Sequence, residues 1–210
     1  MDVIRDAKEY VEELFRNDSG GHDAEHTLRV YRNAMRIAGE VPECDPEIVA
    51  LAALLHDADD HKLFHTENDA NARSFLKKHG FGQERIDQIC RVIDSVSFSR
   101  NRGRRPDTAE GKIVQDADRL DAIGAVGIAR TFAYGGEHGR PMSESIEHFY
   151  EKLLLLKEEM NTPAAKKIAE ERHRFLEMFL NEYERETGQV PASEEEKEEN
   201  HAESDHPLPV

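Results

Sequence analysis

The sequence predicts an all-α protein, a helical bundle. Apolar residues recur at helical spacing over most of the chain, and no segment shows a convincing strand pattern. Several helix boundaries follow the expected chemistry, with an acid or a hydroxyl before proline at two starts and glycine after two ends. A chain of 210 residues is long enough for one domain with a substantial core.

Five helices are predicted in the amino-terminal half. The first has one apolar face and is broken by the polar, glycine-containing run 17–21. The third starts at Asp45 and Pro46 and is apolar nearly all round, so we expect it to be central and buried. Thr66 and Asp69 resemble a capping box that opens the fourth. The five predicted spans are 3–15, 23–38, 45–56, 66–80 and 83–96.

The carboxyl-terminal half is predicted to hold one or two helices over 109–134, a loop from Gly135 to Pro141, and two further helices. The aromatic and leucine-rich run 149–156 is expected in the core. The predicted spans of the last two helices are 143–159 and 163–187. We assign residues 1–188 to one domain and 189–210 to an acidic tail, which has little to bury and is expected to be disordered.

Charge and composition limit the partners. The net charge is −16, and the run 191–210 contributes seven acids and one lysine. An acidic body repels phosphate backbones, so duplex nucleic acid is not expected as a partner, whereas a bound divalent metal can reverse the local field for a small phosphorylated substrate. The two cysteines are expected to be free thiols. The sequence shows neither a signal-peptide pattern nor an apolar run of ~18 residues, so we expect a cytoplasmic protein without membrane contact; the oligomeric state stays open.

Ionisable residues gather at a few points of this apolar pattern. His56 and Asp57 directly follow the apolar third helix, and three aspartates interrupt the apolar segment 113–126. His26 shares a helix face with His22, four residues earlier. Buried carboxylates and imidazoles are costly unless they are paired or bind a metal. Mixed nitrogen and oxygen ligands suit a divalent ion. The candidates are Mn²⁺, Mg²⁺, Fe²⁺, Co²⁺, Ni²⁺ and Zn²⁺.

The order His26, then His56 and Asp57, then Asp118 resembles the H…HD…D pattern of the HD-domain metal-dependent phosphohydrolase superfamily. The flanking segments 21–30, 53–57 and 115–124 are similar to its small bacterial stand-alone branch, and the resemblance covers residues 1–187. It implies an HD-domain helical bundle with the metal site in the helix core. It also implies that His26, His56, Asp57 and Asp118 are the ligands of a divalent metal ion.

Three further residues are candidates for the chemistry. Asp60 is similar in placement to an acid that orients or deprotonates water in relatives, although a solvated carboxylate explains it equally well. Many superfamily members carry Gly-Lys after the HD pair, where this chain has Asp59 and Asp60, so the role of that lysine does not transfer to Asp60. Lys62 and Arg29 are the expected substrate-binding cations. The basic loop 100–105 either grips a polyphosphate or balances nearby acids.

The resemblance implies a metal-dependent phosphohydrolase that acts on small phosphorylated substrates. Nucleotides are the leading class, with a nucleoside triphosphate converted to monophosphate and pyrophosphate. A 5′-nucleotidase or a cyclic-nucleotide phosphodiesterase is the enzymatic alternative, because the four ligands do not fix which phosphorus is attacked. A metal-stabilised nucleotide-binding or signalling module is the alternative of another class.

Overall fold

The computed structural model describes residues 2–16, 24–60, 63–96 and 104–188. Within these ranges the chain forms nine α-helices and one 3₁₀ helix, with no strand among the described residues. The all-α prediction is confirmed. The predicted tail 189–210 and most of the basic loop lie outside the described residues.

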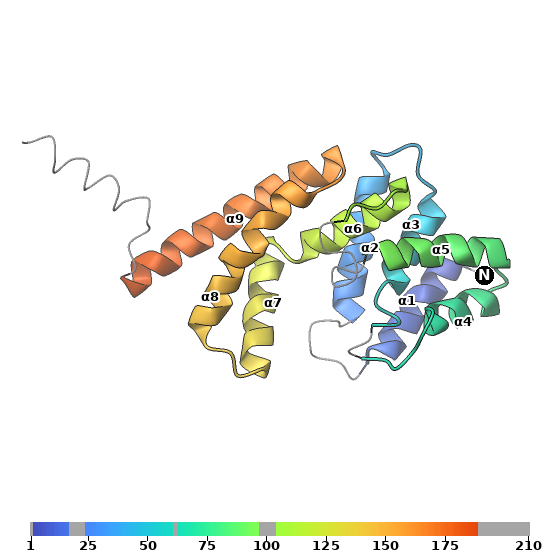
Figure 1. Ribbon diagram of the computed structural model, residues 1–210, viewed down its shortest axis with the longest axis horizontal. Helices are drawn as coiled ribbons and strands as arrows, with labels where there is room; N and C mark the ends of the chain where they lie inside the picture. Colours follow the sequence, from blue (N-terminus) through green and yellow to red (C-terminus); the bar gives the residue numbers. More distant parts are fainter. Residues whose placement is uncertain (1, 17–23, 61–62, 97–103, 189–210) are drawn as a thin grey trace, which may run out of the picture.

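The helices α1 to α6 form one group, on the right of Figure 1. Helix α3 is central, because all eight side chains from Ile48 to Leu55 are buried. It contacts α1, α2, α5 and α6, so an apolar surface all round is required. The bounds are α1 (Val3–Leu14), α2 (Ala24–Ala38), α3 (Pro46–Leu55), α4 (Ala70–Lys78), α5 (Gln83–Val96) and α6 (Ala109–Asp121).

The remaining helices form a second group beside the first (Figure 1). Three rings hold it together, since Phe149 lies 6.0 Å from Phe132 and 5.6 Å from Phe179, centroid to centroid. Aromatic rings at this separation add packing energy beyond the area they bury. The bounds are α7 (Gly124–Glu137), α8 (Met142–Glu151), the 3₁₀ helix η1 (Leu153–Glu159) and α9 (Pro163–Thr187).

Two boundary predictions in this group are wrong. The loop was expected to begin at Gly135, but α7 continues to Glu137. Gly135 serves helix packing, because a Cβ there would lie 2.6 Å from Ser145 Oγ on α8. The helix expected over 143–159 divides at Lys152, whose backbone (φ −139°, ψ −56°) leaves α-helical geometry.

The leucine-rich run is only partly in the core. Phe149, Leu153 and Leu156 are buried as expected, but Tyr150 and Leu155 are exposed. Tyr150 lies on the outer face of α8, and the period of three in η1 buries Leu153 and Leu156 while Leu155 faces outward.

The predicted caps give a mixed outcome. The side chains of Asp45 and Thr162 accept hydrogen bonds from the first turns of α3 and α9, as expected. The predicted capping box at Thr66 and Asp69 is wrong, because the side chain of Asp69 makes no capping hydrogen bond. The carboxylate of Asp59 caps α4 instead, from outside that helix.

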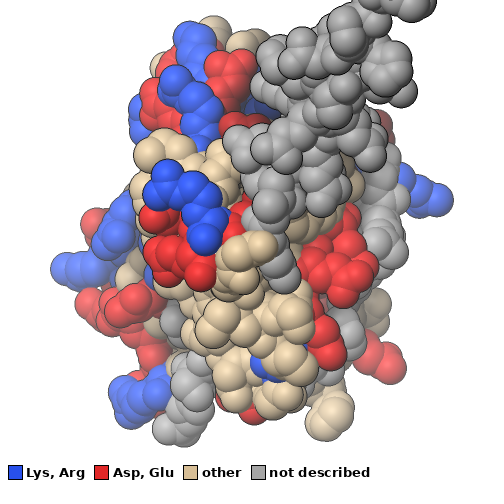
Figure 2. All heavy atoms as spheres, turned by 90° about the vertical axis from the view of Figure 1, so that its left-hand side faces the viewer, with Lys and Arg blue, Asp and Glu red and all other residues tan. Residues whose placement is uncertain are grey.

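The remaining surface features agree with the sequence. Cys44 and Cys90 are free thiols. Among the helices that the structure describes, none is both long and apolar enough for a membrane span. On the face of the molecule turned to the viewer in Figure 2, described acidic and basic side chains are interspersed around an area of uncharged residues. This face therefore presents mixed charge rather than a surface of one sign.

Candidate metal centre

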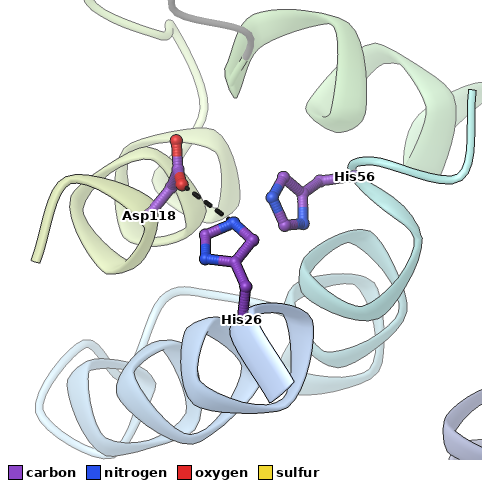
Figure 3. Close-up of side chains that lie close together, drawn as sticks. All are labelled: His26, His56 and Asp118. Atoms are coloured by element: carbon purple, nitrogen blue, oxygen red, sulfur yellow. Dashed lines mark ion pairs between the residues drawn. The ribbon is translucent and has the colours of Figure 1, made fainter. Parts of the chain in front are cut away.

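Three helices bring ionisable side chains to one point. Figure 3 shows His26 from α2, His56 after the end of α3 and Asp118 from α6 pointing toward one another. One ligand atom of each lies within 4.8 Å of the others. The contacts of α2 with α3 and with α6 are the most extensive in the fold, so the helices that carry these residues are held firmly together.

The end of α3 sets the direction of His56. His56 is the C-cap residue of α3, and its Nδ1 lies 2.9 Å from the carbonyl oxygen of Ala53. A carbonyl only accepts, so Nδ1 carries the hydrogen and donates. The Nε2 of His56 then has a lone pair, and this atom is buried without a hydrogen-bond partner among the described residues.

The same arrangement holds for His26. Its Nδ1 lies 2.7 Å from Asp121 Oδ2, so the opposite ring nitrogen, Nε2, is directed to the cluster. That Nε2 lies 3.5 Å from Asp57 Oδ2 and 3.5 Å from Asp118 Oδ1. The Nε2 of His56 lies 3.3 Å from the same oxygen of Asp57. Asp57 therefore contacts both imidazoles, and Asp118 contacts that of His26.

The donor set fits a divalent metal ion. In octahedral coordination at ~2.1 Å, adjacent ligand atoms lie about 3 Å apart, which is close to the separations of 3.3 and 3.5 Å found here. The buried Nε2 of His56, which has no hydrogen-bond partner among the described residues, and the carboxylates beside it offer the ligands that such an ion needs. Nitrogen and oxygen ligands together suit a first-row divalent ion or Mg²⁺.

The electrostatics of the cluster favour positive charge. Burial lowers the pKa of His56, but the Asp57 and Asp118 carboxylates outweigh it and raise the pKa to about 9. Burial likewise lowers the pKa of His26, and its hydrogen bonds to Asp121 and Asp57 leave that pKa raised. Protons and a metal ion therefore compete for the same imidazoles.

The histidine side chains of the cluster are shielded from solvent, whereas Asp118 is partly exposed to it. The side chains of His26 and His56 are 2% and 4% exposed, whereas those of Asp57 and Asp118 are 13% and 28% exposed. A small ligand approaching the cluster would therefore meet the carboxylates first, while the imidazoles stay fixed in the helix core.

The other predicted site residues have different settings. Asp60 is partly buried, and its backbone N–H donates to the carbonyl of Asp57 at 3.0 Å, so a tight turn holds both residues near each other. Lys62 and residues 97–103 of the basic loop lie outside the described residues. Arg29 does not stand alone, because its Nε and Nη2 donate to Asp121 at 2.8 and 3.1 Å. The roles assigned to Asp60, Lys62 and Arg29 stay predictions.

Asp121 is the residue near the cluster to which the sequence assigned no role. Burial raises its pKa, but the hydrogen bonds from His26 and Arg29 and the charge of Arg130 hold the pKa well below its usual range. The sequence spacing could have placed Asp121 near the cluster, because it follows Asp118 by three residues on α6 and shares its helix face.

Asp116 lies on another face of α6 and serves the fold. Its carboxylate accepts four hydrogen bonds of 2.7–2.9 Å, from the backbone and side chains of Asn161 and Thr162. Burial raises its pKa, while these donors oppose that effect. Asp116 thus fastens the start of α9 to α6.

The chain as a whole is similar to several known proteins. The family model described as the HD domain matches residues 23–123. YpgQ of Bacillus subtilis is 41% identical over 192 residues, which span 87% of this chain and 93% of YpgQ. A crystal structure of YpgQ in complex with ADP superimposes with a TM-score of 0.75 at 37% identity, covering 90% of this chain and 98% of that one. An HD-superfamily hydrolase from Bacillus thuringiensis gives a TM-score of 0.72 at 39% identity, with 89% and 97% covered.

Proposed function

Because the chain belongs to the HD domain family, we propose that it is a metal-dependent phosphohydrolase whose substrates are nucleotides. The observation that carries the proposal is the convergence of His26, His56, Asp57 and Asp118 on one space, with a buried imidazole nitrogen that lacks a hydrogen-bond partner among the described residues. The nucleotide class is supported by the crystal structure of the relative YpgQ in complex with ADP.

The side chains have separate tasks in this proposal. His26, His56, Asp57 and Asp118 would hold the ion, with the histidines fixed in the core and the carboxylates toward the substrate. When bound, a divalent ion lowers the pKa of a water molecule and neutralises charge on a phosphoryl oxygen. Asp60, held one turn after Asp57, would orient the attacking water or accept its proton.

The leading reaction is hydrolysis of a nucleoside triphosphate to monophosphate and pyrophosphate. Water adds its oxygen to one phosphorus of the α–β anhydride, the bridging bond breaks, and the proton of the water leaves to Asp60 or to solvent. Lys62 and Arg29 are the proposed cations for the phosphate groups. The net charge of −16 makes local cations and the metal necessary for binding an anionic substrate.

A hydrolysis screen tests the proposal. Metal-stripped protein would receive Mn²⁺, Mg²⁺, Co²⁺ or Ni²⁺ singly, with nucleoside triphosphates, monophosphates and cyclic nucleotides as substrates. Metal-dependent pyrophosphate is the expected product, and isotopically labelled water would show which phosphorus is attacked. Orthophosphate from monophosphates, or opening of cyclic nucleotides, would move the assignment to a nucleotidase or a phosphodiesterase. Tight metal binding without turnover on any substrate would favour a binding or signalling module.

A further inference from the structure

Asp121 is a buried carboxylate at the last residue of α6, and it joins three helices. It is 1% exposed and accepts four hydrogen bonds from three side chains. His26 and Arg29 come from α2, and Arg130 comes from α7. The Nη1 of Arg130 donates to Oδ2 at 2.7 Å, the same oxygen that faces His26 Nδ1 at 2.7 Å.

The two arginines decide what Asp121 does to His26. Two guanidinium groups within hydrogen-bond distance of one buried carboxylate keep that carboxylate ionised, so it can only accept. The Nδ1 of His26 must therefore donate to it. When the imidazole is neutral, its lone pair is then on Nε2, the atom that faces Asp57 and Asp118, and this is the form that binds a metal ion.

We infer that Asp121, held by Arg29 and Arg130, is a positioning residue that fixes the orientation and tautomer of His26 for metal binding. The inference rests on the proposed metal site. Carboxylates that receive the second N–H of a metal-binding histidine orient its ring and raise its basicity, and their loss weakens metal binding about 10–100-fold.

The inference gives the second helical group a part in the site. Arg130 lies beyond the matched HD segment 23–123, on α7. The turn before it is tight, since Gly124 adopts φ +77° and a Cβ at Gly127 would lie 2.2 Å from the carbonyl oxygen of Ala122. These two glycines let α7 begin directly against the end of α6, which brings Arg130 within reach of Asp121.

A purely structural role for Asp121 is the competing explanation, and α6 offers a matched control. Asp116 is also fully buried on α6 and also accepts four hydrogen bonds, but its donors are Asn161 and Thr162 instead of a histidine and arginines. Replacing either aspartate by asparagine puts an NH₂ group where a carboxylate oxygen accepted. Both changes destabilise the fold, so only metal binding and the state of His26 separate the two roles.

The experiment compares Asp121→Asn and Asp116→Asn with the unaltered full chain. Binding of Zn²⁺ and Ni²⁺ is measured by calorimetry, and nitrogen NMR of labelled histidine in the metal-free protein, at a pH at which the imidazole of His26 is neutral, reports whether its Nδ1 carries the proton. We expect Asp121→Asn to weaken metal binding about 10–100-fold and to reduce the Nδ1–H signal. We expect Asp116→Asn to leave both unchanged at a temperature where it is folded.

The outcomes separate this inference from the proposed function. Unchanged metal affinity and an unchanged Nδ1–H signal in Asp121→Asn would overturn the inference alone. Metal binding by the unaltered protein without hydrolysis of any substrate would overturn the enzymatic proposal alone. If Asp121→Asn does not fold, Arg130→Gln decides, because it keeps the carboxylate and removes one donor. A smaller loss of metal affinity in the same direction supports the inference, and no loss overturns it.

Discussion

The metal cluster and the junction between α6 and α9 both place carboxylates against buried side chains, but the partners of those carboxylates differ in kind. At the junction, Asp116 meets four donors and is satisfied by the protein itself. At the cluster, Asp57 and Asp118 face the Nε2 atoms of two imidazoles that can take up or release a proton. The kind of partner that a carboxylate meets, rather than its burial alone, therefore distinguishes these two sites.

The largest expected effect comes from removing a carboxylate of the cluster. Asp57→Ala should abolish metal binding and turnover, because Asp57 Oδ2 lies 3.5 Å from the Nε2 of His26 and 3.3 Å from that of His56. The fold should remain helical, because the helices around Asp57 are held together by the buried apolar core. Calorimetry with Ni²⁺, a pyrophosphate assay and circular dichroism measure the three properties.

Asp107→Ala is the control for that change, because Asp107 is an exposed aspartate ahead of α6. It should bind metal and turn over like the unaltered protein. Full activity in Asp57→Ala would contradict the metal assignment.

The opposite pattern is expected at the junction. Asp116→Ala leaves several buried donors of Asn161 and Thr162 without an acceptor at once. Each costs roughly 1–3 kcal/mol, so we expect a loss of about 3 kcal/mol or more. For a chain of this size that lowers the Tm by about 6–12 °C. Thermal unfolding measures it, and an unchanged Tm would show that the four hydrogen bonds do not hold α9 to α6.

The sequence predicted the cluster better than the junction, for a physical reason. His26, His56, Asp57 and Asp118 come from three segments, but their order along the chain resembles a known pattern, so the set could be proposed without knowing any contact. Asp116 and Asp121 lie in the same acidic segment as Asp118. Which of these aspartates meets donors depends on α9 and α7, and helix packing of that kind is not readable from spacing alone.

The same limit explains the errors in the fold. Long helices with apolar periodicity were predicted correctly because each needs only its own sequence. The interruption at Lys152 and the continuation of α7 through Gly135 depend on neighbouring helices, as the close approach of Ser145 to Gly135 shows. The capping of α4 by Asp59 spans more than ten residues, beyond the reach of a local capping motif.

The effect of pH should distinguish the cluster from the rest of the protein. The folded pKa of His56 is raised from 6.5 to about 9, so the protonated form favours the folded, metal-free protein. That contribution is fully present below about 6.5 and is lost as the pH rises through about 9. A metal ion needs the neutral imidazole, so metal affinity should rise over the same interval, by up to about tenfold per pH unit for each proton displaced.

Thermal unfolding between these pH values, with and without Ni²⁺, measures both trends. The Tm without metal should fall with rising pH, and the increase in Tm caused by Ni²⁺ should grow. In Asp57→Ala, which lacks one ligand, the Ni²⁺ effect should be small at every pH. A Ni²⁺ effect that is constant over the interval in the unaltered protein would contradict proton competition at the histidines.

The smallest effect on stability is expected at Asp59, whose neighbour Asp60 has a different proposed role. The carboxylate of Asp59 accepts from the backbone N–H groups of Asn71 and Ala72, both at 3.0 Å, and so caps α4. Asp59→Ala should cost about 1 kcal/mol, the usual value of a helix cap, and lower the Tm by about 2–4 °C. Turnover of the folded protein should be retained, since this carboxylate is occupied by α4.

Asp60→Ala is the matched variant one residue further on. It should bind Ni²⁺ with unchanged affinity and keep the Tm, while turnover falls because the attacking water loses the group proposed to orient it. Unchanged turnover would remove Asp60 from the mechanism. A loss of turnover in Asp59→Ala, at a temperature where the protein is folded, would show instead that the position of α4 matters to the site. The two variants together test whether Asp59 serves the fold and Asp60 serves the chemistry. Asp116 and Asp57 are expected to differ in the same way, with larger effects.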